Sequence, residues 1–354
     1  MEERTGRRPR IADVAREAGV SKTAVSFAFN SPGRLAPETA TRIRTVADSL
    51  GYRPHPVARM LSQRATRTLG VLTPQALSVI FSNPFFGAFS EGVALAAEQE
   101  GYALHFISPL HGSLAHAMNR ATVDGAVVIG LSARHPEIEQ LRAAGLPLVT
   151  VDSSALPDQP TVEIDDVGGA RQAAEHLIGL GHRDVLVVDI EPLNPGVGMD
   201  FEGVGTRRMR GYLGAFEAAR IALPDTASVV APATIEGGIA ALRRAWEDGL
   251  RPTGVLVMSD AMAIGVIRAA RELGLRVPQD LSVIGFDDID ISQHTNPPLT
   301  TVHQPIRLKG ETAVRLLLGM IEGRDRHPAP VRLETRLIIR ESTGPAPRTA
   351  GHGR

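Results

Sequence analysis

The chain has 354 residues, of which 43% are hydrophobic and 22% charged, the proportions of a globular protein long enough for two or three domains. It contains no cysteine, which excludes disulfides, thiolate zinc sites and a cysteine nucleophile. The formal net charge is −1, yet residues 1–67 hold 13 Lys/Arg against 6 Asp/Glu. A basic head on an acidic body is expected where one end of a chain meets a polyanion, although a solvated basic tail shows the same excess.

The first ten residues are charged and lead into no apolar run, which is not the pattern of a signal peptide. No uninterrupted apolar stretch reaches the roughly 18 residues that a membrane span needs. We therefore expect a cytoplasmic, nucleoid-associated protein without a membrane partner.

Residues 11–50 predict three short helices, because their apolar residues recur every three or four positions. Ser21 stands at the N-cap position of the second helix, and Val25, Ala28 and Phe29 form its buried side. Gly51 ends the third helix. Residues 1–52 are thus predicted to form an all-α headpiece.

Residues 53–67 contain Pro54 and Pro56 before one short basic amphipathic turn, which indicates a linker with at most marginal helix of its own. From Thr68 onward, short Val- and Ile-rich strands that are apolar on both faces alternate with helices, the pattern of parallel sheets covered on both sides. The predicted strands are Leu69–Thr73, Ala103–Ile107, Gly125–Ile129, Leu148–Asp152, Val185–Ile190, Val229–Ala231, Gly254–Met258, Ser282–Phe286 and Thr300–Val302.

So many strands exceed a usual sheet of about five or six, which favours two parallel-sheet lobes within residues 68–345. The stretch from Thr343 is rich in Pro, Gly and Thr, and we expect disorder there, with residues 346–354 as the tail.

Two long segments carry a resemblance to a known family. IADVAREAGVSKTAVSFAFN, followed by APETATRIRTVADSLGYRPHPVARML, resembles the helix-turn-helix headpiece of the LacI/GalR family of bacterial regulators. RPTGVLVMSDAMAIGVIRAARELGLRVPQDLSVIGFDD, followed by PPLTTVHQP, is similar to the sensor domain of that family. The resemblance implies an α/β sensor with the fold of periplasmic sugar-binding proteins.

The second headpiece helix has a polar face that can enter the major groove of double-stranded DNA. Its exposed positions are Lys22, Thr23, Ser26, Phe27 and Asn30, and the backbone at Ser21 can meet a phosphate. A helical hairpin with a solvated polar face is the alternative, which a bare phenyl at position 27 argues against. The family commonly has Arg or His at the position of Phe27, so the resemblance implies a different operator base pair there.

The resemblance also implies that the linker becomes a hinge helix on operator DNA and wedges Leu61 into the minor groove. Ala58 lies beside that leucine, and Tyr52 and His55 complete the predicted DNA-binding set. The alternative for Leu61 is a buried linker leucine. Because a single headpiece binds weakly, a homodimer on a near-palindromic operator is implied.

The resemblance places a small effector, sugar-like or purine-like, between the two lobes. The residues that we assign to it are Phe85, Phe86, Asp152, Arg208, Ser259, Asp260 and Asp287. An arginine fork and a carboxylate facing each other suit a polar ring. Alternatives stay open: the two phenylalanines fit the core equally well, and Asp287 could cap the next segment, with Asp288 competing for its role.

Two loops, Gln75–Asn83 and residues 191–206, are longer than the family pattern, so the ligand of better-known relatives should not be transferred. No nucleophile elbow, P-loop or H-E-x-x-H motif occurs, and the histidines show no shared metal-ligand spacing. We therefore expect no enzyme activity, no cofactor and no metal. A ligand-binding receptor without DNA function is the remaining alternative, opposed by the basic headpiece.

Overall fold

The computed structural model describes residues 9–53, 65–73, 75–109, 112–118, 120–131, 134–153, 159–191, 203–224 and 227–347. These residues belong to two compact units, one ending at Thr66 and the other beginning at Arg67. Most of the predicted hinge, residues 54–64, lies outside the described residues.

The first unit is a small helical headpiece with the helices that the sequence predicts. Its elements are α1 (Ile11–Glu17), α2 (Lys22–Asn30), the 3-10 turn η1 (Pro32–Arg34) and α3 (Pro37–Ser49). The Ser21 hydroxyl caps α2 by accepting a 3.1 Å hydrogen bond from the Ala24 amide. Val14, Val25 and Ile43, one from each helix, are fully buried and hold the three helices together.

Arg44 of α3 fixes the end of α2. Its guanidinium donates through Nε and Nη2 to the Ala28 carbonyl at 3.2 and 3.1 Å. Because the last carbonyls of a helix lack partners within it, this pair of hydrogen bonds stabilises the C-terminal turn of α2.

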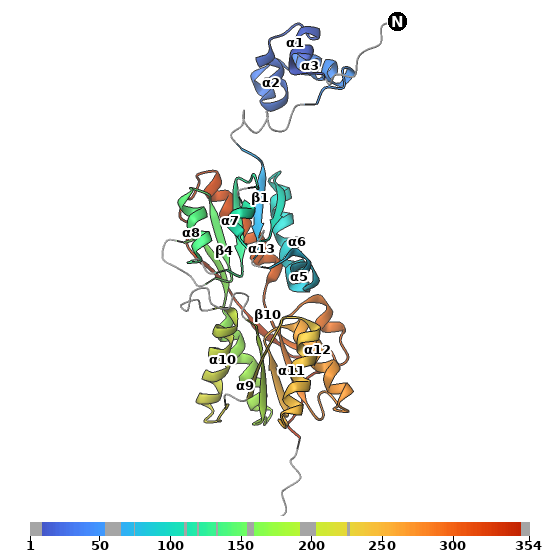
Figure 1. Ribbon diagram of the computed structural model, residues 1–354, viewed down its shortest axis with the longest axis vertical. Coiled ribbons are helices and arrows are strands. Elements are labelled where there is room, and N and C mark those ends of the chain that lie inside the picture. Colours follow the sequence, from blue (N-terminus) through green and yellow to red (C-terminus); the bar gives the residue numbers. More distant parts are fainter. Residues whose placement is uncertain are drawn as a thin grey trace, which may run out of the picture. The chain divides into compact units, whose positions relative to one another are not determined.

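The second unit contains two six-stranded sheets, each the centre of one lobe (Figure 1). The first sheet has the order β11-β5-β4-β3-β1-β2, and the second has the order β12-β10-β9-β8-β6-β7. The first-lobe strands are β1 (Thr68–Leu72), β2 (Ala103–Ile107), β3 (Gly125–Ile129), β4 (Leu148–Val151), β5 (Thr161–Ile164) and β11 (Val331–Leu333). The second-lobe strands are β6 (Val185–Ile190), β7 (Ser228–Ala231), β8 (Gly254–Val257), β9 (Ser282–Asp287), β10 (Thr300–His303) and β12 (Arg336–Ile338).

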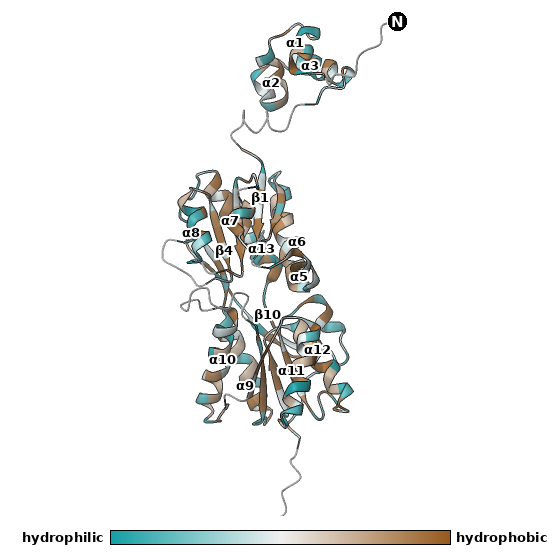
Figure 2. Ribbon diagram, in the orientation of Figure 1, coloured by the Kyte–Doolittle hydropathy of each residue, from teal (hydrophilic) through white to brown (hydrophobic). Residues whose placement is uncertain are grey.

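Helices cover the faces of both sheets, and the strands between them are predominantly hydrophobic (Figure 2). The helices of the first lobe are α5 (Leu77–Ser82), α6 (Pro84–Gln99), α7 (Leu114–Met118), α8 (Pro136–Ala143) and α13 (Ile306–Ile321). Those of the second lobe are α9 (Asp166–Gly179), α10 (Val204–Ala218), α11 (Ile235–Glu247), α12 (Asp260–Glu272) and the 3-10 turn η3 (Asp290–His294).

The chain passes between the lobes after β5, after β10 and after β11. The segments that cross therefore lie next to the carboxyl ends of strands of both sheets. Ligands of open α/β sheets bind outside these strand ends, so the crossing region is where a site is expected.

All nine predicted strands are present, with bounds that differ by at most a residue at an end. Strands β5, β11 and β12 were not predicted from the sequence. Of these, β12 pairs antiparallel with β10, while the other described pairs are parallel. The expectation that every strand is apolar on both faces is wrong for β2 and β7, which alternate or are half-exposed because they are edge strands.

Helices α6 and α13 pack in close contact through two glycines. A β-carbon on Gly92 of α6 would lie 2.0 Å from the Arg307 carbonyl oxygen, and one on Gly310 of α13 would lie 2.5 Å from the Phe89 carbonyl oxygen. The absence of both side chains lets α13 approach α6 closely, and Lys309 directly precedes Gly310 at this contact.

The predicted disorder from Thr343 is wrong for the first residues of that stretch. Thr343 Oγ1 lies 3.0 Å from His176 Nε2, and the Ala346 amide donates to the Leu180 carbonyl at 2.9 Å. His182, which is fully buried, contacts the Gly344 carbonyl at 3.0 Å. These contacts satisfy backbone polar groups that composition alone assigned to solvent.

Candidate functional site

The predicted DNA-reading residues of the headpiece lie along one side of α2. Lys22 and Thr23 in its first turn are exposed. Ser26 and Asn30, one helical turn apart, are half-buried and joined by a 3.2 Å hydrogen bond from Asn30 Nδ2 to Ser26 Oγ. The exposed side chains of Lys22 and Thr23 are therefore free to move, whereas Ser26 and Asn30 restrain each other.

Phe27 differs from the expectation of a bare phenyl. It is half-buried, and the Arg34 guanidinium lies 5.4 Å from its ring centroid. The contact with Arg34 explains a phenyl ring at this position within the headpiece itself. The presence of Phe27 on this face is therefore not by itself an argument that α2 reads DNA.

Tyr52 belongs partly to the headpiece core, because its ring packs edge-on against Phe29 with centroids 5.9 Å apart. Burial raises the pKa of its phenol. The other predicted hinge contacts, His55, Ala58 and Leu61, lie outside the described residues.

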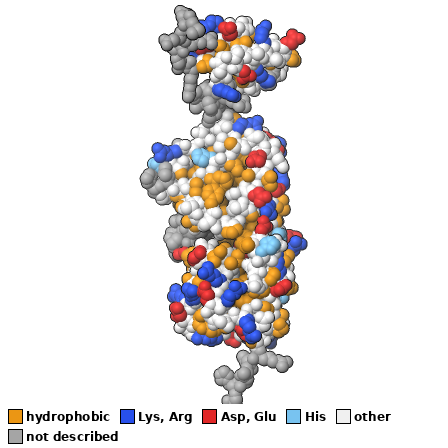
Figure 3. All heavy atoms as spheres, turned by 90° about the vertical axis from the view of Figure 1, so that its right-hand side faces the viewer, with side chains coloured by type: hydrophobic (Ala, Val, Ile, Leu, Met, Phe, Trp, Pro, Cys, Tyr) orange, Lys and Arg blue, Asp and Glu red, His pale blue; other side chains and the backbone are white. Residues whose placement is uncertain are grey.

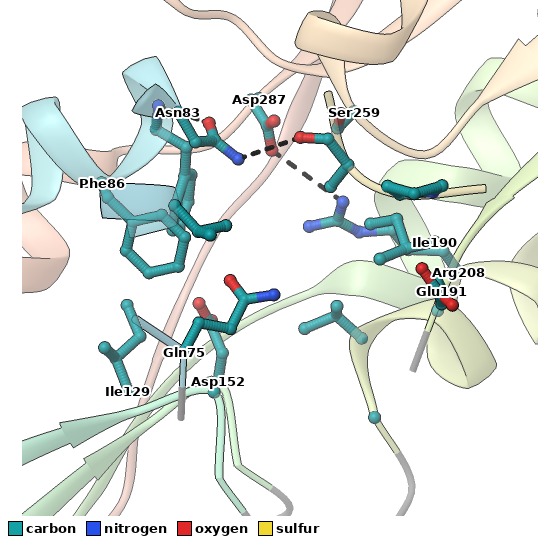
Figure 4. A pocket seen from close by; sticks show the side chains of 18 of the residues that line it. Gln75, Asn83, Phe86, Ile129, Asp152, Ile190, Glu191, Arg208, Ser259 and Asp287 are labelled. Carbon is teal, nitrogen blue, oxygen red and sulfur yellow. Dashed lines mark hydrogen bonds and ion pairs between the residues drawn. The ribbon is translucent and has the colours of Figure 1, made fainter. Parts of the chain in front are cut away.

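In the second unit, the described residues line a cavity of about 580 Å³ between the two lobes (Figure 4). The cavity takes in six of the seven predicted effector residues: Phe85, Phe86, Asp152, Arg208, Ser259 and Asp287. A volume of this size suits a small molecule. Both loops that exceed the family pattern contribute as well, through Gln75 on one side and Gly203–Thr206 on the other.

The aromatic wall comes from the start of α6. Asn83 caps this helix by accepting a 3.0 Å hydrogen bond from the Phe85 amide, and its Nδ2 reaches the Ala233 carbonyl of the other lobe at 3.4 Å. Phe85 and Phe86 are half-buried with ring centroids 5.2 Å apart, whereas Phe89, one turn on, fills the core. The first two rings are thus the ones that a ligand can touch.

Arg208 is buried and held by carboxylates on two sides. Its Nε donates to Asp166 Oδ1 at 2.9 Å, and its Nη1 lies 3.9 Å from Asp287 Oδ1, the ion pair drawn in Figure 4. Burial by itself lowers the pKa of Arg208, but the Asp166 and Asp287 carboxylates outweigh it and leave that pKa raised. Asp166, which the sequence analysis missed, also accepts from Arg207 Nε at 2.9 Å.

Asp287 ends β9 with a backbone φ of +128°, a conformation that residues other than glycine rarely adopt. Burial raises the pKa of its carboxyl to about 7, against the opposing charge of Arg208. Its neighbour Asp288 contacts His303 and Arg340 at 2.9 and 2.6 Å and does not line the cavity. Of the two candidates, Asp287 is therefore the one at the site.

Ser259 and Asp260 have separate structural roles. Ser259 lines the cavity but caps α12, since its hydroxyl accepts from the Met262 amide at 3.3 Å. Asp260 is fully buried away from the cavity and accepts hydrogen bonds from Ile289, Ser292 and Thr301. Burial raises the pKa of Asp260 to about 6. Asp260, which was predicted to bind the effector, does not line the cavity, because these donors hold its carboxylate in the interior.

Asp152 lines the cavity at the end of β4 and pairs with Lys309 at 2.7 Å. Lys309 and its neighbour Gln304 were missed from sequence. Lys309 does carry a signal, a cation on the buried face of α13, whereas nothing in the local pattern marks Gln304.

Two kinds of feature are absent from the described residues. No group of three or more His, Cys, Asp or Glu in the described ranges is placed to hold a metal ion. No helix in that same part of the chain has the length and apolarity of a membrane span.

The sequence profile of bacterial regulatory proteins of the lacI family matches residues 10–55, and the periplasmic binding protein-like domain matches residues 174–343. The HTH-type transcriptional regulator CelR of Thermobifida fusca is 32% identical over 95% of this chain and 98% of its own. Catabolite control protein A of Priestia megaterium is 32% identical over 94% of this chain and 98% of its own. The HTH-type transcriptional repressor PurR of Salmonella paratyphi A is 33% identical over 95% and 97%.

Solved structures agree over both units. A CelR–cellobiose complex superposes with a TM-score of 0.70 at 30% identity, covering 95% of this chain and 100% of that one. The lac repressor dimer bound to operator and the anti-inducer ONPF gives 0.79 at 25% identity, covering 96% and 100%. The headpiece, the two parallel-sheet lobes and nearly the full length of these regulators are thus shared. The chain belongs to the lacI family of bacterial transcription regulators.

Proposed function

We propose that the protein binds a palindromic operator as a homodimer, represses transcription from it, and releases or tightens its hold when a small polar effector occupies the inter-lobe cavity. In this proposal residues 1–52 read DNA, residues 53–67 form the hinge, and residues 68–345 sense the effector and dimerise. The observation that carries the proposal is the presence, in one chain, of an α2 with exposed Lys22 and Thr23 and of a cavity lined from both lobes.

DNA reading is divided between the headpiece and the hinge. Lys22 donates to guanine, Thr23 and Phe27 touch base edges, and Leu61 wedges into the minor groove. The full set of proposed DNA contacts is Ser21, Lys22, Thr23, Ser26, Phe27, Asn30, Tyr52, His55, Ala58 and Leu61.

The effector is a polar ring, sugar-like or purine-like, bound by Phe85, Phe86, Asp152, Arg208, Ser259 and Asp287. The rings supply apolar faces, and the carboxylates accept hydrogen bonds from hydroxyl or N–H groups. The relative solved with cellobiose supports a sugar. The coupling between the two sites is reciprocal. An effector that binds one arrangement of the lobes more tightly increases the population of the DNA-binding state in which the lobes have that arrangement.

A second copy of the chain completes the proposal. Hydrophobic side chains gather on one face of the second unit (Figure 3). The exposed apolar side chains of its first lobe include Phe81 and Leu95. An apolar surface of this kind on a folded unit favours association. The lac repressor, solved as a dimer bound to operator, supports a homodimer.

The DNA arm of the test selects a palindromic site from random duplexes with the full chain and titrates that site over a range of salt. We expect affinity for the selected site to fall steeply with salt, because phosphate neutralisation releases counterions. Leu61→Ala should reduce binding to the selected site more than binding to unrelated DNA. Equal loss on both at fixed salt contradicts the wedge, and no selected site at all favours the receptor without DNA function.

The effector arm measures thermal stabilisation of the full chain by cellobiose, ribose, hypoxanthine and guanine, since a ligand of the native state raises its stability. A compound that stabilises the protein should also change its affinity for the selected site. Stabilisation without any change in DNA affinity contradicts the proposed coupling.

A further inference from the structure

A fully buried lysine lies behind the wall of the inter-lobe cavity. The chain has only two lysines among its 38 Lys and Arg residues, Lys22 in the headpiece and Lys309 in α13. The other buried residues of α13 around it, such as Ile306, Ala313 and Leu317, are mostly apolar. Lysine is almost never fully buried unless it is paired, so the contacts of this side chain need an explanation.

The Lys309 ammonium has three neighbours that are polar or aromatic. Its Nζ donates to Asp152 Oδ1 at 2.7 Å and to Gln304 Oε1 at 2.6 Å, and it lies 5.4 Å from the ring centroid of Phe85. Two of these neighbours, Asp152 and Phe85, line the cavity from the first lobe. The lysine thus supports the cavity wall from behind without lining it.

Gln304 extends this contact to the second lobe. It lies where the chain passes from β10 to α13, is 1% exposed, and donates from Nε2 to Asp287 Oδ1 at 2.6 Å. Hydrogen bonds thus connect four side chains in the order Asp152, Lys309, Gln304 and Asp287, and we call this row the carboxylate relay. The two aspartates at its ends line the cavity, whereas the lysine and the glutamine between them are buried.

Each carboxylate of the relay uses one oxygen in these contacts. Within the part of the chain that the structure describes, the side-chain interactions of Asp152 and Asp287 involve Oδ1, and the Oδ2 atoms accept no hydrogen bond. A carboxylate can accept several hydrogen bonds, so both Oδ2 atoms keep capacity for a ligand.

We propose that Lys309 is a positioning residue of the cavity, which holds Asp152 and, through Gln304, Asp287 so that each presents one free carboxylate oxygen to a single ligand. The inference rests on the proposed function and adds that the effector donates hydrogen bonds to both lobes at once. A compact ammonium with three donors suits this task, because one nitrogen can satisfy two acceptors on different elements. The ion pair itself is no argument for stability, since a buried pair often does no better than an apolar replacement.

The relay can be observed in the unmodified protein, because only two lysines carry a side-chain ammonium. The full chain labelled with ¹³C at lysine Cε should give two signals, assigned with Lys22→Arg. Between pH 5 and 8 we expect the Lys309 signal to move with the midpoint of the Asp287 carboxyl, and this movement to disappear in Asp287→Asn. The Lys22 signal should stay constant. A Lys309 signal that ignores pH, or that moves equally in Asp287→Asn, overturns the proposal.

The direction of coupling is tested by the Asp287 carboxyl, followed with ¹³Cγ-labelled aspartate. The charged groups that face it are Arg208 of α10, Asp260 of α12 and Lys309 of α13. Burial and Asp260 raise the pKa of Asp287, whereas Arg208, the hydrogen bond from Gln304 and Lys309 lower it. Lys309→Met, which keeps an unbranched side chain, should raise the Asp287 midpoint by about one unit, a tenfold change in its protonation equilibrium. Gln304→Leu should raise the midpoint as well.

Arg307→Met is the matched control. It removes one positive charge from the same helix, two residues away, but its guanidinium pairs with Glu91 and Asp290 at the surface. It should leave the Asp287 midpoint unchanged. An equal shift in this control means that net charge alone acts and overturns the relay. If Lys309→Met does not fold, the pH dependence of the wild-type Lys309 signal and the Asp287 midpoint in Gln304→Leu decide the matter.

Binding of cellobiose separates this inference from the proposed function. If cellobiose stabilises the wild type, Lys309→Met should weaken its binding at least about tenfold, the effect of misplacing a charge-assisted acceptor, while Arg307→Met should not. Equal affinity in Lys309→Met overturns the positioning role. If cellobiose does not bind, the choice of effector fails while the two titrations still decide the relay.

Discussion

The guanidinium of Arg208 lies 3.6 Å from the ring centroid of Phe286, stacked on the residue that immediately precedes Asp287. The end of β9 therefore supplies both an aromatic surface and a carboxylate for the same arginine. Because the planar fork is held by stacking and by Asp166, it is oriented before any ligand arrives. Such preorganisation reduces the free-energy cost of ordering the arginine side chain when a ligand binds.

Arg208→Lys keeps the charge but loses the planar fork. We expect it to abolish the effector response while operator binding persists, and to lower the free energy of unfolding by roughly 1–3 kcal/mol. Urea unfolding and an operator titration with and without effector measure the two effects. Arg243→Lys, at an exposed pair with Glu272, is the control and should change stability by no more than about 0.5 kcal/mol. Equal changes in both variants count against a special role for Arg208.

Asp287→Asn should flatten the pH dependence of stability. The carboxyl titrates near 7 in the folded state, above the 3.8 expected of it when unfolded, so the folded state binds the extra proton between these values. Its contribution is present at low pH and is lost as the pH rises toward 7. The variant should reduce the slope by up to about 1.4 kcal/mol per pH unit in that window.

Urea unfolding of the wild type and of Asp287→Asn at pH 5, 6, 7 and 8 provides the comparison. Some slope should remain in the variant, because burial also raises the pKa of Asp260, to about 6. Two curves that run parallel over the whole range contradict the raised pKa of Asp287.

Lys22→Ala tests base reading by the start of α2. If this exposed lysine contacts a guanine, the variant should lose about 1–3 kcal/mol of binding on the selected operator and tolerate any base at one symmetric position. A uniform loss on all sequences, with a smaller salt slope, indicates a phosphate contact instead. Arg16→Ala removes another exposed cation, one that pairs with Asp13 in α1, and should leave base preference unchanged.

Gly92→Ala tests the packing of α13 against the first lobe. Its new β-carbon meets the Arg307 backbone at 2.0 Å, so the helices must separate, and we expect a loss of roughly 1–3 kcal/mol of stability. Gly87→Ala in the same helix has open space and should stabilise the protein by about 0.5–1 kcal/mol, because alanine favours the helix. Similar effects at both positions, in a urea unfolding comparison, contradict the close approach.

Much of the fold was predictable because its signals are local. The spacing of apolar residues predicted the headpiece helices, and Ser21 indicated the start of α2 correctly. Buried strands such as β3 and β8 stood out as short apolar runs. By contrast, β11 and β12 have three residues each and are half-exposed, so their existence depends on pairing partners far away in the chain.

The site was predictable only in part. Asp287 and Asp260 both stand next to a strand end, and the sequence offers no means of telling which side chain points into the cavity. The structure separates them because Gly285 leaves room for Asp260, whose Oδ1 would lie 2.2 Å from a β-carbon at that position. Thr301 and Ser292 then supply donors that draw Asp260 into the interior.

The sequence alone indicated the family, through two long motifs that resemble it, and it predicted the headpiece and the two lobes from the spacing of apolar residues within single helices and strands. Only the tertiary structure decided that Asp166 shares Arg208 with Asp287, and that Lys309 joins Asp152 to Gln304. The residues of each contact lie on different elements, in most cases far apart in the chain. The chain crosses between the lobes three times and brings those elements to one place, which no local pattern can specify.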